Sequence, residues 1–393
     1  MTFEEIREKD DRYVMHTYAR FPVAFVRGKG ATLWDTEGKD YIDLTSGIGV
    51  NALGHDNPLL TAALEKQMHL FMHVSNLYYT EVCVTAAEKL CRASGMSRVF
   101  FANSGAEANE GMIKTARKYS EDRYGAGRNR IITLRDSFHG RTVTTLEATG
   151  QDQFHQYFLP FTGAFDYAVP NDLENLKSLV TKDTCAVMLE LIQGESGVHV
   201  LDPDYVKALA AFCREKDLLL LDDEVQTGVG RTGAFYAYQK FGVTPDIVSS
   251  AKALGGGLPA GAVLVGEKCR DVLGPGQHGS TFGANPMSMA AANVVIDTVS
   301  RPDFLAAVEE KGKKLTEGIL TLHSDKIAEV RGIGLMIGVV LRDPSERSSL
   351  VGKLLEKGVC VLTAGADVIR LLPPLVITDG EIASALSRMA EVF

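Results

Sequence analysis

The sequence predicts an α/β fold, in which a mostly parallel central sheet is flanked by helices and joined to a smaller α+β domain. Through the middle of the chain, short apolar runs alternate with helix-like segments, which is typical of a parallel sheet covered by helices. Both ends depart from this alternation. A length of 393 residues is enough for more than one domain.

The apolar runs give the expected strands in order. Near the start, two short runs flank the turn 36–39 and predict a hairpin. Toward the end, three runs mixed with amphipathic helical stretches predict the smaller domain. We therefore expect an N-terminal segment, 1–49, that joins the small domain, a large domain at 50–289, and a C-terminal small domain at 290–393. The expected strands are 32–35, 41–44, 99–101, 130–134, 186–189, 218–221, 262–265, 332–341, 359–363 and 368–372.

Composition excludes several classes of function. The 41 basic and 50 acidic residues give a net charge of −9 without a basic cluster, which argues against a nucleic-acid surface. The longest apolar runs, such as 335–341, are too short to span a membrane. Residues 1–5 lack a signal-peptide core, so we expect a cytoplasmic protein. The six cysteines form no Cys-x-x-Cys pair, and no metal site is expected.

Lys252 follows the apolar pair Ile247-Val248 and precedes the glycines 255–257. Burial at the end of a strand would depress the pKa of its ammonium group, and a neutral amine can attack an aldehyde. The glycines would let the backbone approach a ligand closely. Taken alone, the position is better explained by a lysine whose stem is buried and whose charge reaches solvent.

The segment Phe101–Glu110 predicts a strand, a Ser-Gly-Ala turn and a helix. Asn103 or Ser104 would cap that helix, with Glu107 in its first turn. Free amides at such a helix N-terminus bind phosphate well, and the serine hydroxyl adds a donor. A capped helix that binds nothing is the alternative.

Four leucines, 218–221, precede Asp222, Asp223 and Glu224. This pattern predicts a buried parallel strand that places carboxylates at its C-terminal end, where ligands bind in open α/β sheets. Such a carboxylate could bind a metal, act as a base, or hold a proton on a ring nitrogen. No histidine cluster accompanies the acids, which disfavours the metal.

The nearby segment Gly228–Gly233 matches G-x-G-x-x-G and raises the alternative of a nicotinamide-dependent dehydrogenase. A dinucleotide site needs its first glycine in the turn directly after the strand. Here that glycine lies seven positions after Leu221 (228 − 221), with three acids between. The segment is better interpreted as a glycine-rich loop.

Three further elements complete the set. Phe138 offers an aromatic face beside Arg141, and the loop 279–286 supplies hydroxyls among glycines. Arg370 ends an expected strand and could bind a carboxylate through two hydrogen bonds. Each feature alone is ordinary, but these five elements together with Lys252 point to one site.

With these elements in place, the chain resembles the class III (ornithine-type) aminotransferases, which are fold-type I enzymes dependent on pyridoxal phosphate. Within that class it is most similar to the acetylornithine aminotransferases of arginine biosynthesis. The resemblance covers nearly the whole chain, from about Phe21 to Arg370. It is carried by the segments 34–43, 50–55, 75–79, 101–107 and 223–228.

The resemblance implies a role for each position. Lys252 would bond to the aldehyde of pyridoxal phosphate and carry a proton between substrate and cofactor. Asp223 would keep the pyridine nitrogen protonated so that the ring accepts electrons. Phe138 would stack on the ring, and Gln226 would approach its phenolic oxygen. The cofactor site as a whole would comprise Ser104, Gly105, Ala106, Phe138, Asp223, Glu224, Val225, Gln226, Lys252 and Thr281.

The resemblance also implies a homodimer with shared active sites, because Thr281 would reach the phosphate of the neighbouring subunit. Arg141 and Ser280 would contact the acetylornithine-type substrate. Arg370 would bind the α-carboxylate of glutamate, and Glu195 would neutralise Arg370 in the other half-reaction.

The implied reaction moves the δ-amino group of N2-acetyl-L-ornithine to 2-oxoglutarate by a ping-pong mechanism. Succinylornithine, ornithine, 4-aminobutyrate or an aminoadipate-derived compound are alternative donors, and a glutamate-1-semialdehyde aminomutase is an alternative class. The segment 46–49 lacks the tyrosine of ornithine aminotransferases, which favours an acylated substrate. Leu191 and Asp222 also depart from the usual family pattern.

Overall fold

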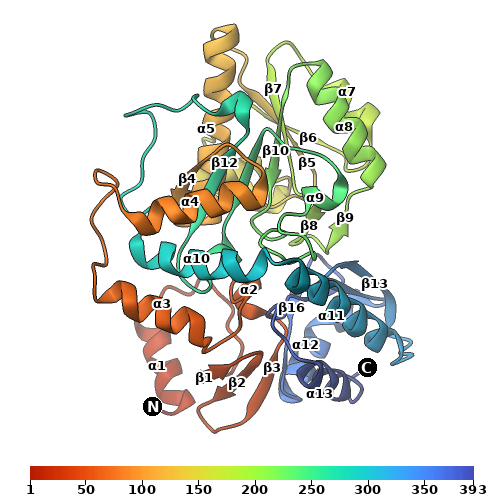
Figure 1. Ribbon diagram of the computed structural model, residues 1–393. Helices are drawn as coiled ribbons and strands as arrows, with labels where there is room; N and C mark the ends of the chain where they lie inside the picture. Colours follow the sequence, from red (N-terminus) through yellow and green to blue (C-terminus); the bar gives the residue numbers. More distant parts are fainter.

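The computed structural model describes all residues, 1–393, and places a seven-stranded sheet at its centre (Figure 1). The strand order is β4-β12-β11-β10-β7-β5-β6. Neighbouring strands run parallel except β12, which is antiparallel to both β11 and β4. The predicted α/β class with a mostly parallel sheet is confirmed. The strands are β4 (Arg98–Ala102), β5 (Arg130–Leu134), β6 (Phe165–Ala168), β7 (Thr184–Leu189), β10 (Leu219–Asp223), β11 (Ile247–Ser250) and β12 (Gly261–Val265).

Helices cover this sheet because its central strands are apolar on both faces. Every residue of β7 and β10 is buried, as expected for strands enclosed on two sides. Helix α5 (Gly105–Tyr124) packs against β10, β11 and β12, and α8 (Pro203–Glu215) against β10. Helix α10 (Pro286–Val299) packs against both α3 and α4. The shorter and peripheral helices are α1 (Phe3–Tyr13), α2 (Ser46–Gly49), α3 (Pro58–Met68), α4 (Glu81–Ser94), α6 (Val143–Ala148), α7 (Leu173–Leu179) and α9 (Tyr238–Phe241).

The two ends of the chain together build one of the smaller sheets (Figure 1). Strands β1 (Phe25–Lys29), β2 (Thr32–Asp35) and β3 (Asp40–Asp43) form the antiparallel ribbon predicted near the start, and β3 pairs in parallel with β15 (Val359–Cys360). A second sheet has the order β13-β14-β17-β16. The domain boundaries near 49 and 289 stay predictions. The other elements are β8 (Ile192–Gln193), β9 (His199–Val200), β13 (Ile327–Ile333), β14 (Met336–Leu341), β16 (Leu362–Ala364), β17 (Val368–Leu371), α11 (Pro302–Leu320), α12 (Arg347–Glu356) and α13 (Asp379–Met389).

Three predicted strands differ from the structure in instructive ways. The run 332–341 is the end of β13 and all of β14, separated by a turn at Gly334 with φ +60°. The run 359–363 is divided between β15 and β16, which belong to different sheets. Strand β10 continues through Asp222 and Asp223, because a sheet neighbour on each side pairs with both the leucines and the first acid.

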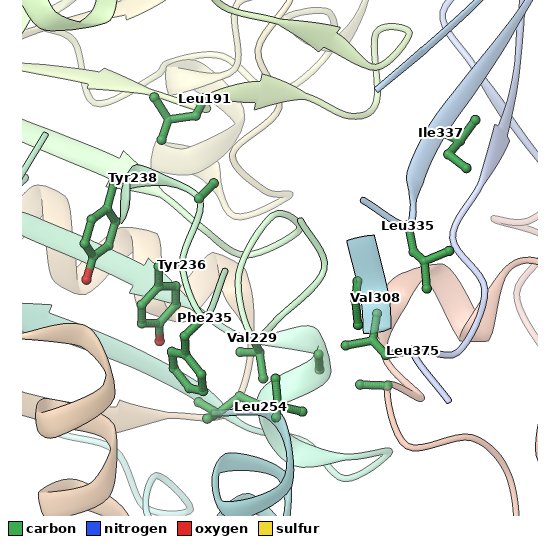
Figure 2. Close-up of a cluster of buried hydrophobic side chains, with 14 of the residues drawn as sticks. Leu191, Val229, Phe235, Tyr236, Tyr238, Leu254, Val308, Leu335, Ile337 and Leu375 are labelled. Carbon is green, nitrogen blue, oxygen red and sulfur yellow. The ribbon is translucent and has the colours of Figure 1, made fainter. Parts of the chain in front are cut away.

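One core joins these parts. A cluster of 63 buried residues includes Ile42, Leu220, Leu315 and Val359, so the central sheet and the small sheets are packed as a continuous interior. Figure 2 shows part of this core, with Val229 and neighbouring aromatic residues facing side chains from the C-terminal part of the chain. None of the helices combines the length and the apolar composition needed to cross a membrane.

Candidate active site

Lys252 lies directly after β11, at the wall between two cavities of about 260 Å³ and about 1280 Å³. Its φ of +45° is uncommon for a residue with a side chain, and such strain persists where the surrounding structure enforces it. Burial is the largest influence on its amine and lowers the pKa. The negative charge of Glu195 opposes this effect, and the positive charge of Arg370 adds to it. Lys252 is therefore a half-buried amine that gives up its proton more readily than an exposed lysine.

Asp223 ends β10 and lines the smaller cavity together with Lys252. Its Oδ2 accepts hydrogen bonds from Asn109 Nδ2 at 2.7 Å and His139 Nδ1 at 2.8 Å. Its Oδ1 accepts from the backbone N–H of Val225 at 3.0 Å and from Ser249 Oγ at 3.3 Å. Four donors thus satisfy a buried carboxylate and fix its orientation. The structure brings together the lysine and the acid that the sequence singled out.

The N-terminus of α5 opens into the same cavity. Ser104 caps the helix, since its Oγ accepts from the Glu107 N–H at 3.2 Å. No protein atom accepts a hydrogen bond from the Gly105 and Ala106 amides, and both residues line the cavity. A Cβ at position 105 would lie 2.7 Å from Val225 Cγ1, so only glycine fits there. Free amides at a helix N-terminus of this kind could bind an anion.

Phe138, Val225 and Gln226 also line the smaller cavity, as predicted for a cofactor site. Glu224 does not. Its Oε2 accepts from Thr227 Oγ1 at 2.5 Å and its Oε1 from the Tyr238 N–H at 2.9 Å, on the opposite side of the strand. Side chains alternate along a strand, so the residue after Asp223 faces away from the cavity.

Arg370, on β17, forms a buried network beside Lys252. Its Nη1 donates to Glu195 Oε1 at 2.8 Å and to Gln226 Oε1 at 3.0 Å. Gln226 Nε2 donates to Glu195 Oε1 at 3.2 Å. Arg370 is 2% exposed, and its Nε has no partner. Burial raises the pKa of Glu195, but the charge of Arg370 and their hydrogen bond outweigh it, leaving the pKa below its ordinary value.

Arg141 lines both cavities, and its guanidinium carbon lies 4.2 Å from the ring centre of Phe154. Ser280 and Thr281 behave differently. They line a separate cavity of about 650 Å³ that shares no residue with the two cavities at Lys252. Within one chain, the structure does not bring these two hydroxyls to the lysine.

Sequence reasoning missed Glu190, Asn109 and His139. The Oε1 of Glu190 accepts from the Phe138 N–H at 2.8 Å, and burial followed by the charge of Asp223 raises its pKa well above the ordinary value. Buried Asn109 Oδ1 and His139 Nε2 have no partner within the chain. The sequence signal for Glu190 was its position directly after the apolar run 186–189, and that signal gains meaning only once β7 is known to neighbour β10.

The glycine-rich loop 228–233 is hydrogen-bonded to both the N-terminal and the C-terminal parts of the chain through Arg231. Arg231 is fully buried and donates to Pro373 O at 2.5 Å, Leu335 O at 3.1 Å and Ser46 Oγ at 3.4 Å. Burial lowers its pKa to about 9. The loop does not lead directly from its strand into a helix, so the structure gives no support to the dinucleotide alternative.

Comparison with known proteins agrees with this geometry. The profile of the family "Aminotransferase class-III" matches residues 13–393. The chain is 49% identical to the acetylornithine aminotransferase of Haemophilus ducreyi, covering 100% of this chain and 99% of that protein. It is 43% identical to the succinylornithine transaminase of Salmonella typhimurium, covering 99% and 97%.

Among solved structures, the ornithine aminotransferase of Toxoplasma gondii superposes with a TM-score of 0.95 at 33% identity, covering 100% of this chain and 95% of the other. The fold is therefore that of the fold-type I transferases. The family match covers nearly the full length, a lysine and a buried carboxylate line one cavity, and an Arg–Glu network lies beside them. The chain therefore belongs to the class-III aminotransferases.

Proposed function

We propose that this aminotransferase moves the δ-amino group of N2-acetyl-L-ornithine to 2-oxoglutarate. The products are N-acetylglutamate 5-semialdehyde and L-glutamate, a step of arginine biosynthesis. The observation that carries the proposal is the Arg370–Glu195 pair, 2.8 Å apart, in a site shared with Lys252. A guanidinium that can be exposed or neutralised suits an enzyme that must bind a dicarboxylate in one half-reaction and a side-chain amine in the other.

Class-III aminotransferases use pyridoxal phosphate, and the residues of the smaller cavity fit it. The free amides at Gly105 and Ala106 would hold the phosphate, and Asp223 would hold a proton on the ring nitrogen. When bound, the cofactor accepts the electron pair that its substrate releases on losing a proton. Lys252 would anchor the aldehyde carbon, and Phe138 would cover one face of the ring.

Lys252 would also move the proton in the reaction. Because burial lowers the pKa of its amine, the neutral form is easier to reach than in an exposed lysine and would take a proton from the substrate carbon. Glu195 and Asp223 lie close enough to influence this pKa, so the protonated form is stabilised in turn. The same amine can then return the proton at the cofactor carbon.

The substrates would be distinguished by two arginines. Arg370 would bind the α-carboxylate of glutamate or 2-oxoglutarate bidentately, and Glu195 would neutralise it when the amine donor is bound. Arg141 would bind the carboxylate of the acylated donor. Gly47 and Ile48 line the larger cavity where ornithine aminotransferases carry a tyrosine, which leaves space for an acyl group.

The functional unit would be a cytoplasmic homodimer. Ser280 and Thr281 line a cavity apart from Lys252 and would complete the site of a second copy. Tyr79, on the segment that neighbours this cavity, is 100% exposed, and Leu77 on the cavity wall is 87% exposed. Large exposed apolar side chains of this kind are typical of a protein–protein interface.

The test is a parallel assay of amine donors with 2-oxoglutarate, ranked by kcat/KM. We expect N2-acetyl-L-ornithine to rank above ornithine and 4-aminobutyrate, and turnover to require 2-oxoglutarate. Turnover without any added oxo acid would favour an aminomutase. The Arg370→Ala variant should lose far more activity with glutamate than with acetylornithine, and equal losses would contradict the proposed switch.

A further inference from the structure

Glu195 lies in a short loop whose backbone is held by the C-terminal part of the chain. The loop, residues 194–198, connects β8 to β9, and we call it the Glu195 loop. Arg331 on β13 donates to the Gly197 carbonyl from Nη2 at 2.8 Å and from Nε at 3.0 Å. The Gly365 N–H donates to the Glu195 carbonyl at 2.9 Å. These three hydrogen bonds fix the loop backbone at Glu195 itself and two residues beyond it.

The arginine that holds this loop shares a row of the small sheet with Arg370. Arg331 on β13 pairs with Gly338 on β14, and Gly338 pairs in turn with Arg370 on β17. Directly opposed residues of antiparallel strands point to the same face, so both guanidinium groups lie on the face against which the Glu195 loop packs. One arginine binds the loop backbone, and the other binds the Glu195 carboxylate at 2.8 Å.

Gly338, between the two arginines, makes room for the loop. A Cβ at this position would lie 3.0 Å from the Cβ of Val198 and 3.2 Å from its Cγ2. Val198 is fully buried and has a φ of +58°, which is uncommon for a β-branched residue and persists where the surroundings enforce it. The loop is therefore seated on the sheet by close packing as well as by hydrogen bonds.

The proposed function requires the Glu195 side chain to release Arg370 when glutamate or 2-oxoglutarate binds, and to pair with it when the amine donor binds. A free loop could make this change by moving its backbone. The contacts of Arg331 and Gly338 oppose that movement and leave rotation of the Glu195 side chain as the available change.

From this arrangement we infer that Arg331 is a positioning residue for the choice between the two substrates. It holds the Glu195 backbone so that the carboxylate returns to Arg370 in the half-reaction of the amine donor. Arg331 lines neither cavity at Lys252, so it acts through Glu195 and not on a substrate. The inference rests on the proposed function and extends it to a residue outside the site.

Loss of the Arg331 contacts should harm the two half-reactions unequally. A loosened loop pairs Glu195 with Arg370 less often, so Arg370 keeps its full charge while the donor binds. The side-chain amine of the donor is itself positively charged, and a neighbouring cation that is not neutralised opposes its binding. Binding of 2-oxoglutarate needs Arg370 free of Glu195 and should not suffer.

The test measures kcat/KM for each substrate of the holoenzyme separately. In Arg331→Gln the value for N2-acetyl-L-ornithine should fall about fivefold, mainly through KM, whereas the value for 2-oxoglutarate should change less than about twofold. Arg342→Gln, an exposed arginine directly after β14, is the matched control and should change neither value.

A second variant tests the loop from its packed side. The added Cβ of Gly338→Ala would displace Val198 and should shift the ratio of the two kcat/KM values in the same direction as Arg331→Gln. Gly352→Ala, where an added Cβ meets nothing within 4 Å, is its control. If Arg331→Gln does not fold, an unchanged ratio in Gly338→Ala would by itself overturn the inference.

A double-mutant cycle separates positioning from a general loss of stability. In a Glu195→Ala background, Arg331→Gln should have no further selective effect on the donor, because the carboxylate that it positions is gone. Hydrogen exchange gives a measurement independent of turnover: the amides of residues 192–200 should exchange about fivefold faster in Arg331→Gln than in the wild type.

The failures of the inference and of the proposed function are distinguishable. Equal losses for donor and acceptor in Arg331→Gln, or an undiminished selective loss in the Glu195→Ala background, would overturn the positioning role and leave the proposed function intact. A wild type that uses 4-aminobutyrate in place of N2-acetyl-L-ornithine would overturn the proposed function. The ratio of kcat/KM for 4-aminobutyrate to that for 2-oxoglutarate would then decide the role of Arg331.

Discussion

The two faces of strand β10 carry acids of equal depth and opposite character. Asp223 is 3% exposed, and four donors satisfy its carboxylate beside the cavity. Asp222 is 1% exposed, and neither of its oxygens has a partner. Burial, and then the charges of Glu224 and Asp223, raise the pKa of Asp222 well above its ordinary value. Two acids at similar depth on one strand therefore differ in how well hydrogen-bond donors satisfy them.

We call the face of β10 that carries Asp223 and lines the cavity the open face, and the face that carries Asp222 and Glu224 the closed face. Acids on the closed face hold their protons to higher pH than usual. Glu224 has two donors, yet burial is the largest influence and raises its pKa to about 7. Around it lie Tyr236 and Tyr238, whose rings stack with centres 5.6 Å apart (Figure 2). The Tyr236 hydroxyl has no partner within the hydrogen-bond limits. The comparison therefore predicts that substitutions on the open face change catalysis, whereas substitutions on the closed face change how the free energy of unfolding depends on pH.

The largest test of the open face is Lys252→Ala. Lys252 is the only lysine that lines the smaller and the larger cavity of the candidate active site. Its removal therefore leaves no amine to anchor the cofactor or move the proton. We expect transamination to fall below detection while the fold is kept, with Lys182→Ala, an exposed lysine without an ion pair, as control. Normal turnover in the Lys252 variant would remove it from the mechanism. Borohydride should fix the cofactor covalently in the wild type and not in the variant.

The next test is Asp223→Ala. This change removes the only carboxylate that four donors hold at the cavity, and with it the proton that it would keep on the ring nitrogen. We expect kcat to fall by about 10²-fold or more. Single-turnover kinetics should assign the loss to proton abstraction. An unchanged rate would show that the open face of β10 has no part in the chemistry.

On the closed face, Glu224 should make stability depend on pH. Its pKa is raised from 4.5 to about 7 on folding, so the folded chain keeps a proton that the unfolded chain has released. Its stabilising contribution is therefore present at low pH and is lost as the pH rises from 4.5 through 7, by roughly 3 kcal/mol.

The measurement for Glu224 is urea unfolding of the wild type and Glu224→Gln at several pH values. The difference between their unfolding free energies should change over this window and be flat above pH 8. A difference that does not vary with pH would mean that Glu224 is ionised on both sides of the folding equilibrium.

The smallest effect on catalysis is expected for Asp222→Val, the matched partner of Asp223→Ala on the neighbouring position. Replacing an unpartnered buried carboxyl by an apolar side chain should stabilise the fold by about 1–2 kcal/mol and change kcat less than about twofold. Urea unfolding and the standard assay measure both quantities. A loss of activity comparable to that of Asp223→Ala would erase the distinction between the two faces.

What the sequence could predict was local. Lys252 and Asp223 were identifiable because each follows an apolar run, and a carboxyl end of a parallel strand is a ligand site. Glu190 was missed because its position beside Asp223 depends on β7 pairing with β10, which the order of elements does not specify. The run 359–363 was predicted as one strand because nothing local marks the point where it passes from one sheet to another.

The sequence pattern also could not predict which side of a strand a residue faces or which cavity it lines. Glu224 follows Asp223 directly and was placed in the same site, but the alternation of side chains continues through β10 and turns it to the other side. Ser280 and Thr281 belong by resemblance to the phosphate and substrate sites, yet one chain keeps them in a cavity of their own. In the proposed homodimer a second copy would bring them to the site, an arrangement that one chain alone does not contain.

The pairing of β3 with β15 constrains how the protein is made. Ile42 of β3 lies opposite Val359 of β15, and Glu381 accepts a hydrogen bond from the Ala31 N–H at 2.8 Å. The amino-terminal strands therefore cannot complete their pairing until residues about 320 positions later are translated (359 − 42 = 317). The strands of the central sheet leave the ribosome before β15 does, so during that interval the edge of the amino-terminal ribbon at β3 lacks its partner strand. Slow translation through the last quarter of the message should therefore prolong the interval in which the edge of this ribbon is unpaired.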